Sequence, residues 1–239
     1  MAEYYRAYDE RYKAAYASGA EFLGGSENDP RVAAAIEKWI TDKGIGGGSI
    51  LEYACGEGGN GEPILRHRCR YWGVDVSLSA LIHARRRLNS FPVARVYFAD
   101  MTKHQMAGKY EGILDCEGFD MLVTDEDRRK YLANVHFALK QDGSVLFLKV
   151  LCGENAYSGA VNSIEEWDEI ASFDHTGVEQ VSAFGSDNTF ESPVIPRRAK
   201  TKEDLVSELE RAGFVVEAFE IMGDANDGCK YASILAHKA

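Results

Sequence analysis

The amino-acid sequence predicts an α/β protein with a doubly wound, mostly parallel seven-stranded sheet, a reversed last strand and a small α/β cap. Three observations support this prediction. Apolar, strand-like runs alternate with helical patterns between residues 29 and 150, which indicates βαβ units with parallel strands. A glycine-rich turn follows the first of these runs. The last two runs are joined by turn-forming residues at 223–228, which predicts an antiparallel pair.

Each strand is expected where an apolar run of strand length occurs, at residues 49–54, 69–76, 93–100, 110–116, 144–150, 214–222 and 230–238. Each helix is expected where apolar residues recur at helical spacing, at residues 29–44, from the glycine turn to about 68, 77–90, 125–143 and 201–214. In the first helix, Asp29 is the expected N-cap, Pro30 occupies the first turn and Gly44 ends the helix. Gly143 is expected to end the fourth helix.

The chain of 239 residues predicts a single domain over residues 1–239. Within it, residues 1–29 form an N-terminal helical segment, and residues 152–199 form a long insertion that we expect to be the cap. Long connections at the carboxyl edge of a parallel sheet are usually functional.

Composition and charge limit the partners. The net charge is −11, whereas nucleic acids and anionic membranes are held by clustered Lys and Arg, so neither is expected as a partner. The five cysteines are widely spaced without a C-x-x-C pair, which predicts reduced thiols and no metal site. The N-terminus lacks the apolar core of a signal peptide, and the apolar runs are too short to span a bilayer. We therefore expect a cytoplasmic monomer or homodimer.

The glycine turn indicates a nucleoside site. Gly56, Gly58 and Gly61 have the G-x-G-x-x-G spacing of dinucleotide-binding turns, in which backbone N–H groups lie close to the ligand. Glu52, in the strand before the turn, would repel a pyrophosphate but would help to position a ligand that carries a cationic amine. On these residues alone, a nicotinamide cofactor remains an alternative.

The stretch ILEYACGEGGNG resembles motif I of the class I S-adenosylmethionine-dependent methyltransferases, an apolar strand that ends in acid-x-x-x-Gly-x-Gly. The resemblance continues in order through YWGVDVSLSALIHAR, VYFADM, YEGILDCEG and LKQDGSVLFLKV, where Gln141 and Asp142 replace a proline and a glycine of the family pattern. It covers residues 30–151 and 200–239. It implies a Rossmann-like methyltransferase fold, S-adenosylmethionine as the cofactor, and methyl transfer to a small-molecule acceptor by in-line displacement.

The resemblance also implies which residues hold the cofactor. These are Glu52, Ala54, Gly56 and Gly58 in motif I, and Asp75, Val76, Asp100, Met101 and Cys116 at the ends of the next three strands. Asp75 would bind the ribose hydroxyls, Asp100 would reach the adenine amino group, and Met101 would flank the ring. A buried core thiol is the alternative interpretation of Cys116.

The acceptor site is less defined. The sequence DCEGFD after the fourth strand lacks the Asn/Asp-Pro-Pro-aromatic motif of base-methylating enzymes, which argues against a nucleic-acid acceptor. Glu117 and His175 are the candidate general bases, although a base is needed only when the acceptor holds its proton too tightly. The candidate acceptor contacts are Tyr4, Tyr8, Tyr12, Phe119, Tyr157 and Arg197. A solvated loop pair is the alternative interpretation of Arg197 and Arg198.

Two further patterns bear on the acceptor. Tyr4, Tyr8, Tyr12 and Tyr16 form one aromatic stripe on a helix, which is either a packing face or, as in similar small-molecule methyltransferases, a lid. Residues 150–196 contain nine acidic residues interleaved with aromatic ones and no Lys or Arg, which favours a cationic acceptor unless it is only a solvated surface. Two other functions stay open: a non-catalytic cofactor-binding or scaffold subunit, and a nicotinamide-dependent oxidoreductase.

Overall fold

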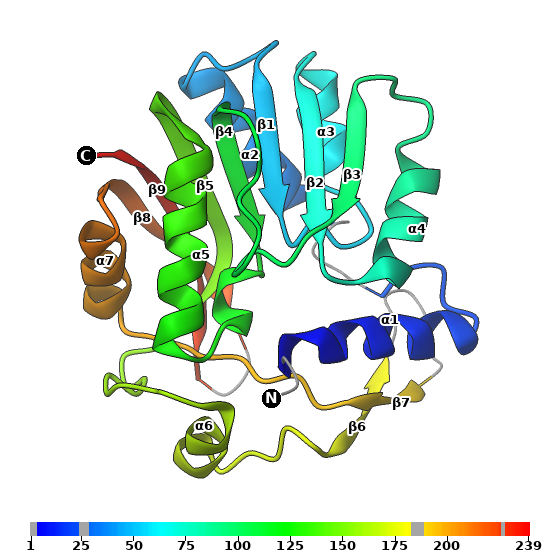
Figure 1. Ribbon diagram of the computed structural model, residues 1–239, viewed down its shortest axis with the longest axis vertical. Coiled ribbons are helices and arrows are strands. Elements are labelled where there is room, and N and C mark those ends of the chain that lie inside the picture. The colour runs from blue at the N-terminus through cyan, green and yellow to red at the C-terminus, as the bar shows by residue number, and fades with distance from the viewer. Residues whose placement is uncertain (1–3, 24–28, 183–188, 226–227) are drawn as a thin grey trace.

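The computed structural model describes residues 4–23, 29–182, 189–225 and 228–239. Its centre is a seven-stranded sheet with the order β3-β2-β1-β4-β5-β9-β8 (Figure 1). The strands are β1 Ser49–Tyr53, β2 Arg70–Asp75, β3 Ala94–Phe98, β4 Tyr110–Cys116, β5 Leu139–Cys152, β8 Phe214–Asp224 and β9 Lys230–Lys238. Strands β1 to β5 are parallel, and β9 runs antiparallel to both of its neighbours. The predicted fold class, with its reversed last strand, is confirmed.

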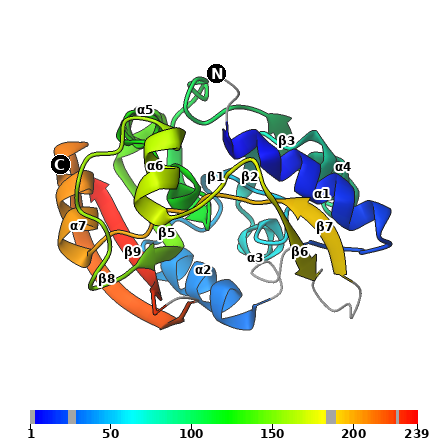
Figure 2. The same ribbon diagram turned by 90° about the horizontal axis from the view of Figure 1, so that it is seen from below.

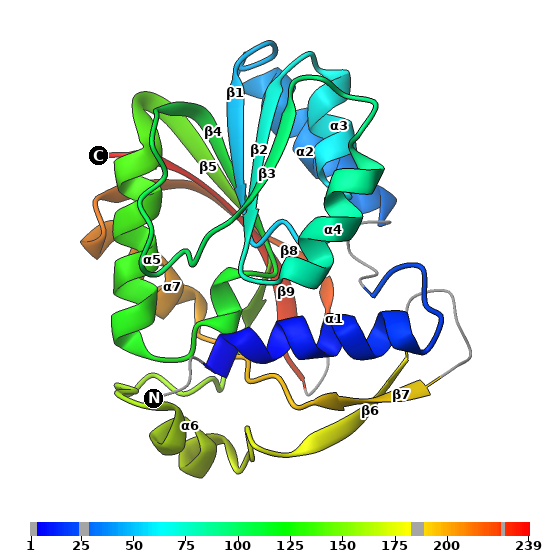
Figure 3. The same ribbon diagram turned by 45° about the vertical axis from the view of Figure 1, so that its right-hand side comes forward.

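Helices cover both faces of this sheet (Figure 3). They are η1 Tyr4–Arg6, α1 Ala7–Ala17, α2 Pro30–Asp42, α3 Gly61–Arg66, α4 Leu78–Arg87, η3 Phe119–Met121, α5 Asp125–Ala138, α6 Ile164–Ala171 and α7 Lys202–Arg211. One apolar cluster packs α2, α3 and α4 on one face, and a second packs α5 and α7 on the other. Burial of these two stripes is the main source of stability.

Helix starts follow the expected capping. The Asp29 carboxylate accepts a hydrogen bond from the Arg31 N–H, and Pro30 is the first residue of α2. The Thr201 hydroxyl accepts from the Asp204 N–H at the start of α7. Each contact satisfies a backbone donor that has no partner inside the helix.

The expectation that the helix over 125–143 ends at Gly143 is wrong. Helix α5 ends at Ala138, and β5 begins at Leu139, which pairs with Tyr110 of β4. Gly143 is needed for a different reason: a Cβ there would lie 3.0 Å from the Glu111 carbonyl oxygen. The glycine therefore allows close approach of two strands and does not mark a helix end.

The carboxyl ends of the parallel strands form one edge of the sheet, and two separate segments lie across it. Figures 1 and 2 show α1 crossing this edge, with the two-stranded sheet of β6 Val178–Ser182 and β7 Thr189–Pro193 on the far side of α1. We call α1 and the β6–β7 hairpin together the cover. Phe184 and Asp187 of the insertion, and Asn226 and Asp227 of the predicted last turn, lie outside the described residues.

Helix α1 is attached to the sheet layer by specific contacts. The Asp9 carboxylate accepts hydrogen bonds from the Ser77 hydroxyl and the Ser79 N–H at the start of α4. The ring of Tyr16 stacks on that of His83 at a centroid distance of 3.6 Å. These contacts hold the N-terminal segment over the carboxyl edge.

Candidate active site

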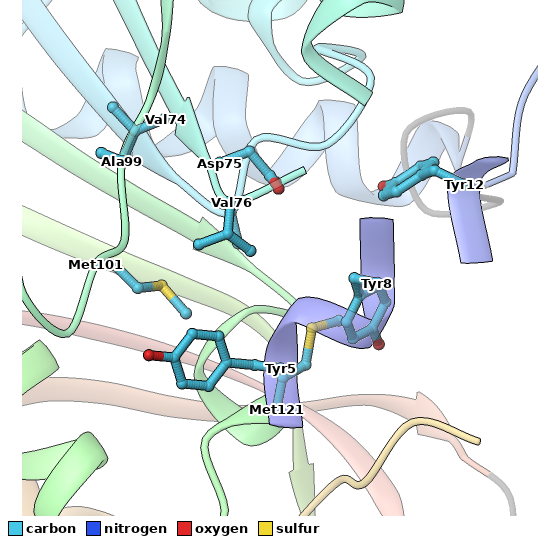
Figure 4. A pocket seen from close by; sticks show the side chains of 10 residues that line it. Tyr5, Tyr8, Tyr12, Val74, Asp75, Val76, Ala99, Met101 and Met121 are labelled. Atoms are coloured by element: carbon cyan, nitrogen blue, oxygen red, sulfur yellow. The ribbon is translucent and has the colours of Figure 1, made fainter. Parts of the chain in front are cut away.

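A narrow cavity of about 60 Å³ lies under α1 at the ends of β2 and β3. Its walls are mostly apolar and are formed by Tyr5, Tyr8, Tyr12, Ala54, Val74, Asp75, Val76, Ala99, Met101 and Met121. Figure 4 shows side chains from the sheet on one side of this space, and Tyr5, Tyr8 and Met121 on the other. A flat, largely apolar ring matches such walls, and one buried carboxylate supplies a polar anchor.

Asp75 is that carboxylate. It ends β2 and is 9% exposed. One of its oxygens accepts a hydrogen bond from the Gly56 N–H at 2.8 Å, and the other accepts from the Ser77 N–H at 2.8 Å. Burial raises the pKa of Asp75, and these two donors partly oppose the rise. The side chain therefore ties the glycine turn to the end of β2 while it faces the cavity (Figure 4).

The glycine turn has the backbone that its residues predict. Gly56 and Gly58 have φ angles of 50° and 78°, a region that favours glycine, and Ala54 has φ 53°. A Cβ on Gly58 would lie 3.1 Å from the Ala84 Cβ, so this glycine lets the turn pack against α4. Ala54 and Gly56 line cavities, whereas Gly58 lines neither of the two described in this section.

Glu52 lies beneath the glycine turn and is fully buried. Its carboxylate accepts hydrogen bonds from the Asn60 amide at 2.8 Å and from the Tyr71 hydroxyl at 2.5 Å. Glu52 lines neither cavity. Its hydrogen-bond partner Asn60 lines the second cavity described below, so Glu52 acts on that cavity by holding Asn60. Its place supports the turn from below.

Asp100 is fully buried at the end of the β3 segment. One oxygen accepts from the Tyr5 hydroxyl at 2.9 Å, and the other accepts from the N–H and hydroxyl of Thr102 at 2.9 and 2.7 Å. Its neighbours Ala99 and Met101 line the narrow cavity, but Asp100 does not. Met101 lies at the cavity wall, where a contact with a ring was predicted. The Asp100 carboxylate, which was expected to reach the adenine amino group, is hydrogen-bonded to Tyr5 and does not line the cavity.

A second cavity of about 230 Å³ adjoins the first and shares Tyr8, Tyr12, Ala54 and Met121 with it. It is enclosed by the glycine turn, the end of β4, α1 and the insertion. Its remaining lining residues are Arg11, Leu23, Cys55, Gly56, Asn60, Cys116, Glu117, Val181, Ser182 and Arg197. The cavity therefore joins the predicted cofactor residues to three of the predicted acceptor residues.

Two ion pairs lie at the wall of the second cavity. The Lys149 ammonium is 2.8 Å from the Glu117 carboxylate, and the Arg197 Nε donates to Asp120 at 2.5 Å. Burial alone would lower the pKa of Lys149, but the Glu117 charge reverses this and leaves the pKa raised. Lys149 is therefore charged at neutral pH and holds Glu117 in place.

Cys116 ends β4 and lies between these pairs and the glycine turn. Burial raises the pKa of its thiol well above the ordinary value, and the charges of Glu117 and Glu52 add to the rise. The thiol is therefore protonated at neutral pH. Cys116 lines the cavity as an apolar wall and does not act as a nucleophile.

Several predicted acceptor residues lie elsewhere. Phe119 is fully buried in the core, and the Arg128 guanidinium lies 3.8 Å from its ring centroid. The turn after β4 directs this ring inward because Gly118 and Phe119 donate their N–H groups to Asp115. The expectation that Phe119 faces the acceptor is corrected.

His175 and Tyr157 also lie outside both cavities. The His175 ring is hydrogen-bonded to the Asp168 carboxylate at 2.5 Å. Tyr157 is 40% exposed in the loop after β5. The insertion folds α6 away from the site, which separates these side chains from it (Figure 1).

The tyrosine stripe has two roles. Tyr4 donates to Asp127 at 3.0 Å and packs against apolar clusters, so it belongs to the packing face. Tyr8 and Tyr12 line both cavities, so they belong to the wall of the site. The packing interpretation therefore fits Tyr4, and the lid interpretation of Tyr8 and Tyr12 stays a prediction.

Several residues at the site were not singled out in the sequence, among them Arg11, Asn60, Met121 and Lys149. Asn60 lies within the glycine motif, and its position there is the only signal that points to it. Met121, Arg11 and Lys149 come from three different elements, and no spacing in the sequence connects them.

The acidic insertion contributes little charge to the site. Among its described residues, no Asp or Glu lines either cavity, whereas Val181, Ser182 and Arg197 do.

No group of three His, Cys, Asp or Glu side chains suited to a metal ion occurs within the described ranges. In those ranges, no helix has the length and apolar character needed to cross a bilayer.

The fold and the site together define a class. A parallel sheet with a reversed seventh strand, a glycine turn after β1 and a cavity-facing acid at the end of β2 are the features of class I S-adenosylmethionine-dependent methyltransferases. Residues 50–143 match a family model described as a methyltransferase domain, and this range contains the glycine turn, Asp75 and the end of β4. The chain therefore contains a methyltransferase domain.

Solved structures with this fold support the assignment. An S-adenosylmethionine-dependent methyltransferase from Clostridium acetobutylicum ATCC 824 has a TM-score of 0.63 and 15% identity, over 87% of this chain and 90% of that chain. The 1,6-didemethyltoxoflavin-N1-methyltransferase of Burkholderia thailandensis has a TM-score of 0.64 and 15% identity, over 98% of this chain and 88% of that one. The glycopeptide N-methyltransferase MtfA with S-adenosylmethionine has a TM-score of 0.59 and 20% identity, over 87% and 94%. No curated protein sequence matches the chain.

Proposed function

We propose that this enzyme transfers a methyl group from S-adenosylmethionine to a small-molecule acceptor by in-line displacement. The observation that carries the proposal is the second cavity, which continues from the cofactor cavity and is closed by the cover. Its volume of about 230 Å³ suits a small molecule or the reactive end of a larger one.

The narrow cavity supplies what the nucleoside part of the cofactor needs. Val76 and Met101 offer apolar surfaces to a flat ring, and Asp75 offers a carboxylate to ribose hydroxyls. Bound S-adenosylmethionine carries its own activated methyl group as a sulfonium. The chain then has three tasks: alignment of the acceptor, exclusion of water and, for some acceptors, removal of a proton.

The cover lies over the second cavity and shields it in part from solvent. Tyr8 and Tyr12 of α1 lie on one side, and Val181 and Ser182 of β6 close another. Arg11 joins the two parts of the cover, because its Nε donates to the Ser192 hydroxyl at 2.9 Å. Methyl transfer in a closed, dry cavity is protected from reaction with water.

Glu117 is the candidate for proton removal. It lines the second cavity directly after β4, with φ 65°, and Lys149 holds its carboxylate at 2.8 Å. This ion pair orients the carboxylate at the wall of the cavity. His175 lies outside the cavity and has no such place.

The structural relatives act on molecules of the proposed class. One of them is a 1,6-didemethyltoxoflavin-N1-methyltransferase with that acceptor bound, and another is a magnesium protoporphyrin IX methyltransferase. A third methylates glycopeptides at nitrogen.

All five cysteines of the present chain are free thiols, which supports a reducing, cytoplasmic setting.

The test is an activity screen with S-adenosylhomocysteine formation as the readout. Small amines, phenols, thiols and carboxylic acids form one arm, and a peptide mixture and total RNA form the others. We expect turnover in the small-molecule arm alone. Turnover confined to peptides or RNA refutes the proposal, and tight cofactor binding without turnover in any arm favours a scaffold subunit.

A further inference from the structure

We propose that the acceptor carries a carboxylate and that Arg197 binds it. This inference rests on the proposed function and names the chemical class of the acceptor. Arg197 lies in the segment between β7 and α7, which passes beneath the ends of β4 and β5 (Figure 3). It lines the second cavity opposite the glycine turn.

The guanidinium of Arg197 has unused donor capacity. Its Nε donates to one oxygen of Asp120, but its Nη2 is buried and has no hydrogen-bond partner among the described residues. The other oxygen of Asp120 is also buried without a partner there. An arginine offers five N–H donors in a planar fork, and a buried donor without an acceptor is unfavourable. A ligand oxygen at this wall would accept a hydrogen bond from the Arg197 Nη2 group.

The neighbouring Tyr8 adds a second donor. Burial raises the pKa of its phenol, although the charges of Arg197 and Arg11 partly oppose the rise. Tyr8 therefore keeps its proton at neutral pH. Within the described ranges its hydroxyl is assigned no hydrogen bond, and its side chain lines both cavities. A phenol O–H and a guanidinium at one wall match the oxygens of a carboxylate.

The charges that line the cavity favour an anion over a cation. Two guanidinium groups, Arg11 and Arg197, and one carboxylate, Glu117, form the charged part of the wall. A cationic acceptor would have to approach Glu117, where the Lys149 ammonium is already 2.8 Å away and would repel it. Of the acidic side chains of the insertion that the structure describes, Glu179 pairs with Arg11 and none lines the cavity. Among the described residues, the insertion therefore places no carboxylate at the wall for a cationic acceptor.

Arg11 has a different task from Arg197. Its Nε donates to Ser192 and its Nη2 to Glu179 and the Pro193 carbonyl. These contacts attach it to the hairpin, so it contributes charge to the wall but few remaining donors. Arg197 is consequently the residue whose removal should abolish recognition of the acceptor.

The cofactor itself has a carboxylate on its methionine part, and the experiment must separate the two. S-adenosylhomocysteine has this carboxylate, and 5′-methylthioadenosine lacks it. If Arg197 binds only the acceptor, Arg197→Met should leave the calorimetric affinities of both probes unchanged. If Arg197→Met weakens S-adenosylhomocysteine alone, Arg197 binds the cofactor and the proposal is overturned.

The acceptor is tested with matched pairs, each a carboxylic acid and its primary amide, drawn from aromatic, hydroxy and amino acids. With the wild-type enzyme we expect kcat/KM to be at least about 10-fold higher for the acid, the effect of one charge-assisted hydrogen bond. Arg197→Met should remove this preference, mainly through KM. Arg197→Lys should retain part of it, because the charge remains but the fork does not.

Two further variants keep the test decisive. Arg197→Met leaves Asp120 buried and unpaired, so Asp120→Asn/Arg197→Met is the companion if the single variant does not fold. Arg129→Met, on the exposed surface of α5 with 68% of its side chain accessible, is the matched control and should behave as wild type. Turnover of none of the acids, a preference for the amides, or a preference that survives Arg197→Met overturns the proposal. Turnover of a non-acidic small molecule in that case would leave the methyltransferase function itself standing.

Discussion

Replacement of Asp75 by alanine should weaken cofactor binding strongly and destabilise the fold modestly. The carboxylate ends β2, faces the narrow cavity and accepts hydrogen bonds from the Gly56 and Ser77 N–H groups. Asp75→Ala removes the predicted ribose anchor and, in addition, the acceptor for two backbone donors. Both consequences follow from one side chain, so the experiment must separate them.

The magnitudes follow from the contacts. Loss of a hydrogen bond to a charged group amounts to about 1.5–3 kcal/mol, which weakens binding of S-adenosylhomocysteine by about 10- to 150-fold. The Gly56 and Ser77 N–H groups left without Asp75 are buried, but water from the adjoining cavity can fill the space of the lost carboxylate. We therefore expect a loss of about 1–2 kcal/mol in the free energy of unfolding. Asp75→Asn keeps an oxygen acceptor and the volume, and should lie between the wild type and Asp75→Ala in both measurements.

Calorimetry with two ligands provides the assay. S-adenosylhomocysteine and its 2′,3′-dideoxy analogue are titrated into wild type and Asp75→Ala, and urea unfolding is measured in parallel. If Asp75 binds the ribose, the analogue binds the wild type more weakly than the parent ligand does, and this difference disappears in Asp75→Ala. An unchanged affinity for the parent ligand in Asp75→Ala, or a difference between ligands that persists, refutes the ribose contact.

Three further predictions concern stability. Burial raises the pKa of Asp115 to about 6 from 3.8, so the folded state binds a proton that the unfolded state has released, and stability should fall as pH rises from about 4 to about 6. Compared with Asp115→Asn in urea unfolding at each pH, wild type should lose up to about 3 kcal/mol over this range; parallel pH profiles would exclude Asp115 as the cause. Tyr5→Phe removes the donor to Asp100 and should cost about 1–2 kcal/mol of stability, with faster proteolysis of the N-terminal segment; equal proteolysis rates would show that other contacts hold α1. Glu52→Ala leaves two buried donors without their acceptor and should lower the free energy of unfolding by at least about 2 kcal/mol, and a smaller loss would mean that water replaces the carboxylate.

Much of the fold was predictable because local patterns and the global sheet agree. The apolar runs of β1, β2 and β4 are buried on both faces, and buried parallel strands have this signature. The caps at Asp29 and Thr201 were readable for the same reason, since a capping side chain acts on its own helix within three residues. The end of α5 was not readable, because pairing of Leu139 with a strand far away in sequence ended the helix before the glycine did.

Some residues of the candidate site were likewise predictable from the sequence, and others were not. Ala54, Gly56, Asp75 and Met101 lie at the cavities because each follows directly from the end of a strand, and the carboxyl ends of parallel strands meet at one edge. Phe119 and His175 were expected there and are not, because a turn directs one into the core and a partner on α6 holds the other away. Neither the burial of Phe119 nor the contact of His175 with α6 can be inferred from sequence spacing alone.

The sequence by itself determined that a nucleoside site lies at the carboxyl edge of the sheet, since a glycine turn between an apolar strand and a helix, followed by acids at successive strand ends, has one topological arrangement in a parallel sheet. The choice of S-adenosylmethionine rested on the resemblance to the methyltransferase family. Only the tertiary structure decided the character of the acceptor cavity. Arg11, Glu117, Lys149 and Arg197 come from α1, the end of β4, β5 and the segment before α7, and each is an ordinary charged residue in its own neighbourhood. Their charges act together because packing brings them within a few ångströms, and no periodicity along the chain encodes that proximity.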